Sequence, residues 1–137
     1  MPPQRTPLTP SYIWDRVIPE PNSGCWLWLG PVGNAGYAVI NLKGRRMNAQ
    51  RGSYIAHFGP VSAGLDVDHL CRNTLCVNPE HLEAVTHREN CRRRSAHITT
   101  CRAGHPYDYI DIRGHRRCRQ CDRAQKARAI LKRAEGK

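Results

Sequence analysis

The chain has 137 residues, of which 22 are Lys or Arg and 11 are Asp or Glu, so its net charge is +11 with neutral His. Hydrophobic residues make up 39%, with one Phe and two Met, which predicts one compact domain with a thin core and small attachments. No apolar run approaches the roughly 18 residues of a membrane span, and the N-terminal MPPQRTPLTP has no apolar signal core. We therefore expect a cytoplasmic protein with no membrane partner, in which a second source of stability supplements apolar burial.

The positive charge is concentrated in the C-terminal part of the chain. Residues 1–87 carry seven basic and six acidic side chains, whereas residues 88–137 carry fifteen basic and five acidic ones. Such a concentration favours a polyanionic partner, because each neutralised phosphate releases a counterion. The alternatives are a solvated basic tail and a membrane surface, but the C-terminal segment lacks the wide apolar face that a membrane helix needs. Nucleic acid is the partner that the charge favours.

The N-terminal half alternates turn signals with short apolar runs. Four prolines among the first ten residues are typical of a flexible arm. Four further features are expected before residue 60, namely a helix at 11–18 stopped by Pro19, a strand at 25–29, a hairpin of 37–42 and 45–50 around Lys43-Gly44, and a helix at 51–58.

The C-terminal half is dominated by Cys, His and basic residues. Thr86 and Glu89 form the T-x-x-E pattern of a capping box, which marks the start of a helix at His87. The features expected here are a strand at 65–69, a loop rich in Cys, Asn and Pro, a helix at 87–96, a loop at 101–121 and a helix at 122–135. The chain therefore belongs to the α+β class.

The spacing of the last four Cys/His ligands predicts a zinc site. Seven cysteines are an odd count, and without a signal peptide they favour metal binding over a disulfide framework. The pairs Cys101-x3-His105 and Cys118-x2-Cys121 each fit a tight turn, and together they make a closed Cys3His tetrahedron. His115 is an alternative to His105, but it belongs to neither pair. Ordinary thiols are the remaining alternative.

A second Cys3His set combines three ligands from one loop with one from an upstream strand. Its members are Cys25, Cys71, Cys76 and His81. The neighbouring Trp26 and Trp28 are interpreted as core residues rather than as platforms for stacking bases. Cys91 is left over, and we expect it to be a small buried residue of the helix at 87–96. Each zinc site would contribute an apparent free energy on the order of 10 kcal/mol, comparable to the stability of a whole domain.

Three polar residues near this set are not needed for zinc binding. A strand, a ligand loop and a helix would bring the oxygen donors of Asp68 and Asn90 together, a donor set that suits Mg²⁺ or Mn²⁺. His69 points to the opposite face of its strand from Asp68, and its imidazole is a candidate general base. Three residues share the helix face of Asn90 and are candidate phosphate contacts, namely His87, Arg93 and Arg94. An Asp-His pair alone is usually structural, but the register with the zinc ligands and Asn90 favours a site.

The segment DHLCRNTLCVNPEHLEAVTHREN, from Asp68 to Asn90, resembles the ββα-metal finger of the HNH endonucleases, which belong to the His-Me finger superfamily. It is most similar to the zinc-stapled His-Cys box type. There, a catalytic His precedes a Cys-x4-Cys-x4-His zinc triad by two residues, and an Asn twenty-one residues after that His binds the catalytic metal; His69 and Asn90 have this separation. The resemblance extends through residues 101–121, which look like the second zinc site of phage-encoded HNH proteins.

The resemblance implies a small zinc-stabilised ββα-metal finger with N-terminal strands and a hairpin, followed by a C-terminal zinc-binding module and a basic helix. Four parts are expected, namely an N-terminal arm and short helix at 1–23, the nuclease domain with the first zinc site at 24–97, a second zinc-binding module at 98–123, and a basic helix and tail at 124–137.

The resemblance also implies a homing endonuclease-like enzyme, active in a bacterial or phage-infected cell, that hydrolyses DNA phosphodiester bonds and leaves 5′-phosphate and 3′-hydroxyl ends. His69 would be the general base, and Asp68 and Asn90 would hold Mg²⁺ or Mn²⁺. Arg51 is a candidate phosphate contact, with a backbone clamp as the alternative, and Asn78 is expected to order its loop. His87 is a phosphate contact, a third metal ligand or a plain helix-start residue.

Three further expectations concern partners and rival functions. Arginines at 92–94, 116, 117 and 119, with the basic helix, would grip the DNA backbone without sequence preference. Double-strand cleavage would need a homodimer or two successive nicks, because one chain has one such site. The rival functions are a non-catalytic zinc-stabilised DNA-binding regulator and an RNA-processing nuclease.

Overall fold

The computed structural model describes residues 8–42 and 44–136 of the chain, which divides into two compact units, residues 1–91 and 92–137. The expected arm therefore lies largely outside the described residues, as does Lys43 of the predicted hairpin turn. Mixed helices and small antiparallel sheets confirm the predicted α+β class. Within the described residues, no helix has the length and apolar character to span a membrane. The expected division into four parts stays a prediction.

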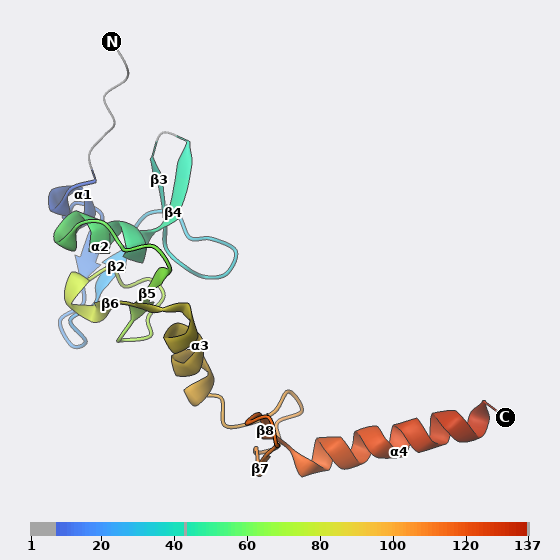
Figure 1. The fold of residues 1–137 in the computed structure, drawn as a ribbon. Coiled ribbons are helices and arrows are strands. Elements are labelled where there is room, and N and C mark those ends of the chain that lie inside the picture. The colour runs from blue at the N-terminus through green and yellow to red at the C-terminus, as the bar shows by residue number, and fades with distance from the viewer. Residues whose placement is uncertain (1–7, 43, 137) are drawn as a thin grey trace. The chain divides into compact units, whose positions relative to one another are not determined.

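Three two-stranded antiparallel sheets and the helices between them form the chain as far as residue 96 (Figure 1). In chain order, the elements are α1 (Pro10–Trp14), β1 (Val17–Pro19), β2 (Trp26–Trp28), β3 (Val39–Leu42), β4 (Arg45–Asn48), α2 (Ala49–Phe58), β5 (Leu65–His69), the 3-10 turn η1 (Pro79–His81), β6 (Leu82–Thr86) and α3 (His87–Ala96).

The predicted helix at 11–18 is too long, because residues 17–19 form strand β1 instead. Thr9 caps α1 through its hydroxyl, and the Arg16 N–H bonds to the Ile13 carbonyl as the helix ends. Val17 then pairs with Trp28 of β2, and this pairing buries the Val17 side chain. Pro19 ends a strand in a two-stranded sheet, a position where a missing N–H is tolerated. Tertiary pairing here overrides the local helix signal.

The hairpin and the helix after it are present with shifted boundaries. Strands β3 and β4 are shorter than predicted, and α2 begins at Ala49 rather than at Arg51. Helix α2 packs closely against β3, because a Cβ atom on Gly52 would lie 2.6 Å from Ile40 Cδ1. At its other end, α2 stops at Gly59, whose φ of 89° is strained for a residue with a side chain.

The core of the first unit is small, as the composition predicts. Its main cluster joins seven buried residues, namely Ile13, Val17, Trp28, Ala38, Ile40, Ala49 and Val77. Trp26 is partly buried and packs against this cluster, so the interpretation of both tryptophans as core residues is confirmed. The cluster joins α1, β2, β3 and α2 to the loop between β5 and η1.

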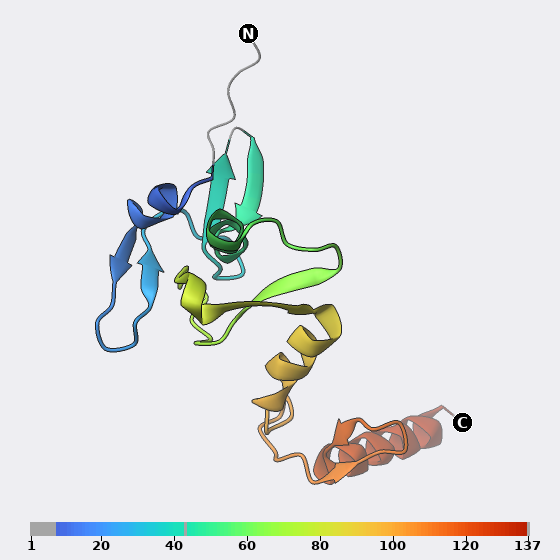
Figure 2. The same cartoon turned by 60° about the vertical axis from the view of Figure 1, so that its left-hand side comes forward.

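A hairpin followed by a helix carries the Asp68–Asn90 segment. Strands β5 and β6 pair with His69 opposite Leu82 and Asp68 opposite Glu83, and β6 runs directly into α3 (Figure 2). Helix α3 has the predicted bounds, and the Thr86 hydroxyl accepts the Glu89 N–H at 3.2 Å, as a capping box requires. The ββα order that the resemblance implies is therefore present.

The second unit contains β7 (Tyr109–Ile110), β8 (Arg116–Arg117) and α4 (Arg119–Glu135). The predicted loop at 101–121 is therefore wrong in part, since it includes the antiparallel pair β7–β8. Helix α4 begins three residues earlier than predicted, with Cys118 as its N-cap. The Asp108 carboxylate accepts the Arg119 N–H at 3.0 Å, which satisfies one of the free donors of the first turn.

Candidate metal centres and active site

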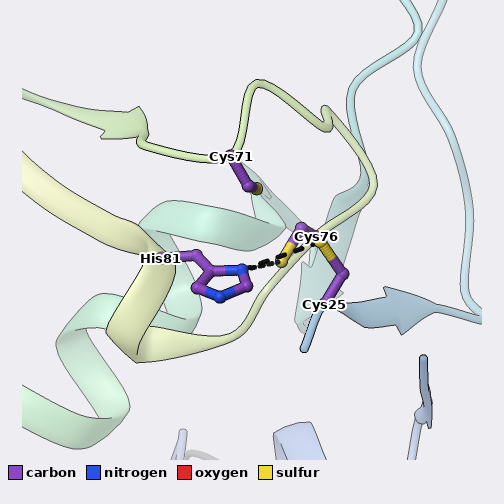
Figure 3. Close-up of side chains that lie close together, drawn as sticks. All are labelled: Cys25, Cys71, Cys76 and His81. Atoms are coloured by element: carbon purple, nitrogen blue, oxygen red, sulfur yellow. Dashed lines mark hydrogen bonds between the residues drawn. The ribbon is translucent and has the colours of Figure 1, made fainter. Parts of the chain in front are cut away.

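Cys25, Cys71, Cys76 and His81 come together with all four ligand atoms within 4.8 Å of one another (Figure 3). His81 Nδ1 lies 3.6 Å from Cys25 Sγ and 3.5 Å from Cys76 Sγ. A zinc tetrahedron with its usual bond lengths places neighbouring ligand atoms about 3.5 Å apart. The donor set and its spacing therefore fit a structural zinc ion.

Hydrogen bonds between β2 and the ligand loop position this first cluster. The N–H of Trp28 donates to the Leu75 carbonyl, and the N–H of Val77 donates to the Trp26 carbonyl, each at 2.9 Å. The Asn78 amide donates to the Gly24 carbonyl at 2.7 Å. Asn78 also accepts the Glu80 N–H, so it orders its loop as expected.

The protonation of the first cluster also favours a bound cation. Burial raises the pKa of the Cys76 thiol to about 12, and burial is the largest cause of the raised pKa of Cys71. Zinc binds thiolates, so the ion would displace these protons and supply the positive charge that the buried sulfurs lack. Metal binding at this cluster would therefore require these thiols to release their protons.

The second unit contains an equivalent cluster of Cys101, His105, Cys118 and Cys121, again within 4.8 Å. The hydrogen bond with Cys101, followed by burial, raises the pKa of Cys121 to about 11. His115 lies outside this cluster and pairs with Asp111 at 3.5 Å, so His105 is the histidine that the structure brings to the ligands. All seven cysteines are free thiols.

The imidazole of His69 is held in a defined orientation. Its side chain is buried, its Nε2 lies 3.0 Å from the Cys76 carbonyl oxygen, and the Tyr37 ring packs beside it at 6.1 Å between centroids. A carbonyl oxygen only accepts, so Nε2 carries the proton and Nδ1 keeps its lone pair in the neutral ring. Burial lowers the pKa of His69, while the Cys76 carbonyl and Asp68 oppose this shift. The ring is therefore neutral near pH 7.

The oxygen ligands predicted for the catalytic metal lie on β5 and α3. Asp68 Oδ1 accepts the His69 N–H at 2.9 Å. The Asn90 amide donates to Asp66 Oδ2 at 3.1 Å, so its hydrogen-bond partner is two residues before Asp68 on the same strand face. His87 Nδ1 lies 2.8 Å from the same Asp66 oxygen. The hydrogen bond with His87, and after it that with Asn90, lowers the pKa of Asp66. A shared metal on Asp68 and Asn90 stays a prediction.

The predicted phosphate contacts occupy α2 and α3. Arg51 Nη1 donates to the Leu65 carbonyl at 3.1 Å, which ties α2 to the start of β5. Arg93 and Arg94 lie in the last turn of α3, in the second unit. Cys91 is exposed, so the expectation that it is buried is wrong; its Sγ lies 3.5 Å from His87 Nε2. α3 has no buried face in the described structure, and this leaves the thiol at the surface.

Two residues beside the site were missed from the sequence. The sequence contained a signal for Asp66: residues i and i+2 of a strand lie on the same face, so Asp66 shares a strand face with Asp68. Tyr37 had none, since it reaches His69 from a distant segment before β3.

Comparison with known proteins supports the resemblance that the motif indicates. Residues 48–92 match the sequence pattern of a family described as HNH endonuclease. Protein 7.7 of Escherichia phage T7 is 35% identical over 66 residues, which cover 48% of this chain and 51% of that protein. Protein 2.8 of the same phage is 37% identical over 71 residues, covering 50% and 48%. The uncharacterized gene 5.3 protein of Enterobacteria phage T3 is 41% identical over 34 residues, covering 25% and 34%.

The resemblance to the HNH endonucleases is therefore confirmed for residues 48–92, which carry α2, β5, β6 and part of α3, and the relatives are phage proteins. The chain spans about half the length of the two T7 proteins it matches. No solved structure matches it.

Proposed function

We propose that the protein is a metal-dependent DNA endonuclease of the HNH type, which leaves 5′-phosphate and 3′-hydroxyl ends. The observation that carries this proposal is the 3.0 Å contact between His69 Nε2 and the Cys76 carbonyl oxygen. It supports a neutral imidazole whose Nδ1 lone pair is free of the carbonyl, as a general base requires.

The chemistry assigned to the chain is proton transfer and positioning. His69 Nδ1 would take a proton from a water molecule, whose oxygen forms a bond to phosphorus in line with the departing 3′ oxygen. The P–O3′ bond breaks, and the 3′ oxygen takes a proton from solvent to give the 3′-hydroxyl end. Asp68 and Asn90 offer hard oxygen donors, a set that fits Mg²⁺ or Mn²⁺. When bound there, the ion would supply positive charge for the phosphate oxygens and the departing 3′ oxygen. The two Cys3His clusters have four protein ligands each, so zinc in them would be structural.

Phosphate binding is assigned to basic residues of α2 and α3. Arg51 is fixed by the Leu65 carbonyl through one N–H, and its other guanidinium donors would serve a phosphate. The remaining candidates are His87, Arg93 and Arg94. In the second unit, the basic side chains of β8 and α4 are exposed and would hold the DNA backbone without reading its bases.

The main alternative is a zinc-stabilised DNA-binding regulator without catalysis. The charge and both Cys3His clusters fit it equally well, but it gives no use to the oriented His69 or to the oxygen donors. An RNA-processing nuclease would keep the same site and change only the substrate.

A plasmid assay separates these functions. We expect the purified protein to convert supercoiled plasmid to nicked circles with Mg²⁺ or Mn²⁺, and His69→Ala to slow this at least about 100-fold while DNA binding and zinc content persist. His115→Ala is the matched control, because His115 is exposed, pairs only with Asp111 among the contacts described, and lies outside both clusters. Intact plasmid across both metals and a range of salt would favour the regulator. Competition between DNA and RNA distinguishes the two nucleases.

A further inference from the structure

The carboxylate of Asp66 is the meeting point of two side chains from α3. Its Oδ2 lies 2.8 Å from His87 Nδ1 and 3.1 Å from Asn90 Nδ2. Asp66 itself lies on β5, opposite Val85 of β6. One carboxylate oxygen therefore joins the strand to the first turn of the helix.

This contact decides which end of the Asn90 amide faces the strand. An ionised carboxylate only accepts hydrogen bonds, whereas the amide has one donating and one accepting end. The NH₂ group of Asn90 must therefore face Asp66, and Oδ1, on the same carbon, is turned away. A hard divalent cation binds the amide through Oδ1 and not through the NH₂ group.

We propose that Asp66 is a positioning residue of the cleavage site, which holds the Asn90 amide with its oxygen turned outward toward a hard divalent cation. This inference rests on the proposed nuclease function, because that function places the cation on Asn90. Asp66 and Asp68 would then have different tasks on one strand face: Asp66 orients a ligand, and Asp68 is a ligand. His87 Nδ1 donates a hydrogen bond to the same oxygen and so restricts the orientation of the Asp66 carboxylate.

The test measures Mn²⁺ binding to the full, zinc-loaded chain by electron paramagnetic resonance of the free ion. Asp66→Ala is expected to weaken Mn²⁺ binding about 10–100-fold, the usual effect of losing a group that orients a metal ligand. The same substitution is then made in an Asn90→Asp background. A carboxylate at position 90 presents oxygen at both ends and needs no orientation, so here Asp66→Ala should cause no weakening.

Two results would overturn the positioning role. Equal weakening in both backgrounds would make Asp66 a direct ligand, and unchanged binding after Asp66→Ala in the unaltered chain would leave it no role at the metal. Asp66→Leu, of similar size and without an acceptor oxygen, repeats the cycle if the Ala variant fails to fold. Asp111→Ala is the matched control, because Asp111 also pairs with a histidine, His115, in the other unit.

Failure of this inference and failure of the nuclease function give different results. Plasmid nicking together with unchanged Mn²⁺ binding in Asp66→Ala would refute the positioning role alone. Mn²⁺ binding that follows the expected cycle without any nicking would refute the nuclease function alone. An unaltered chain that binds no Mn²⁺ would overturn the positioning role.

Discussion

Replacing Cys76 by Ala removes one of the four ligand atoms of the first cluster, and we expect the first unit to unfold. Cys76 is fully buried, and its Sγ lies 3.5 Å from His81 Nδ1. The reason is the size of the metal contribution relative to everything else that holds the ligand loop in place.

The other contacts of the loop are weak by comparison. Two backbone hydrogen bonds join it to β2, from Trp28 N–H to Leu75 and from Val77 N–H to Trp26, and two side-chain bonds join Asn78 to Gly24 and Ser53 to Val77. Each contributes about 1 kcal/mol net, whereas a structural zinc ion contributes on the order of 10 kcal/mol. A small domain has only about 5–15 kcal/mol of stability in total. With a main core cluster of only seven buried residues, the first unit has little to replace the metal.

The assay combines zinc analysis with tryptophan fluorescence. All three tryptophans lie at positions 14, 26 and 28, so fluorescence reports on the first unit alone. Cys76→Ala should lower the zinc content from two ions per chain to one and give the emission of exposed indoles. Cys118→Ala should also lose one zinc but keep the native emission, because Cys118 belongs to the second cluster. Cys91→Ala, exposed and in neither cluster, should change neither reading. Two zinc ions and native fluorescence in Cys76→Ala would refute the reasoning.

Four further results are expected. His69→Ala should lower the nicking rate by about 10²–10⁴-fold, the usual loss of a general base, with two zinc ions retained by elemental analysis; loss of zinc would show that the ligands are wrongly assigned. Because burial lowers the pKa of His69 below its ordinary 6.5, nicking should rise with pH on the acidic side and be level above 6.5. Folding favours the neutral ring, so urea unfolding should show stability falling as pH drops below 6.5, and less steeply in His69→Ala; an unchanged slope would argue against a buried neutral ring. Arg123→Gln with Lys126→Gln on α4 should weaken DNA binding and reduce the salt slope by about 2, measured by fluorescence anisotropy, and an unchanged slope would exclude α4 from the backbone contacts.

The metal ligands could be predicted from the sequence because their constraint is local. Cys101 and His105, or Cys71 and Cys76, lie a few residues apart in a turn, and the spacing alone limits which atoms can meet. Cys25 was found by a different route: it is the one cysteine upstream of the loop, and a closed site needs a fourth ligand. The capping box likewise fixed the start of α3, since its hydrogen bond spans only three residues.

The features that were missed depend on contacts between distant segments. Strand β1 forms only because β2 pairs with it, and residues 11–18 carry no local sign of that pairing. Tyr37 reaches His69 across more than thirty residues of chain. The Asn90–Asp66 bond depends on how the first turn of α3 lies against β5, a rotation that the sequence pattern does not specify.

Cys76 takes part in both the stability and the proposed chemistry through different atoms. Its Sγ is one of the four ligand atoms of the first cluster, while its carbonyl oxygen accepts a hydrogen bond from His69 Nε2. Zinc loss would therefore release the carbonyl that keeps Nδ1 free of its proton. In the proposed mechanism, zinc in the first cluster would be required for cleavage without taking part in it. It would stabilise a unit with a small core, and it would also hold the Cys76 carbonyl that keeps the proton of His69 on Nε2.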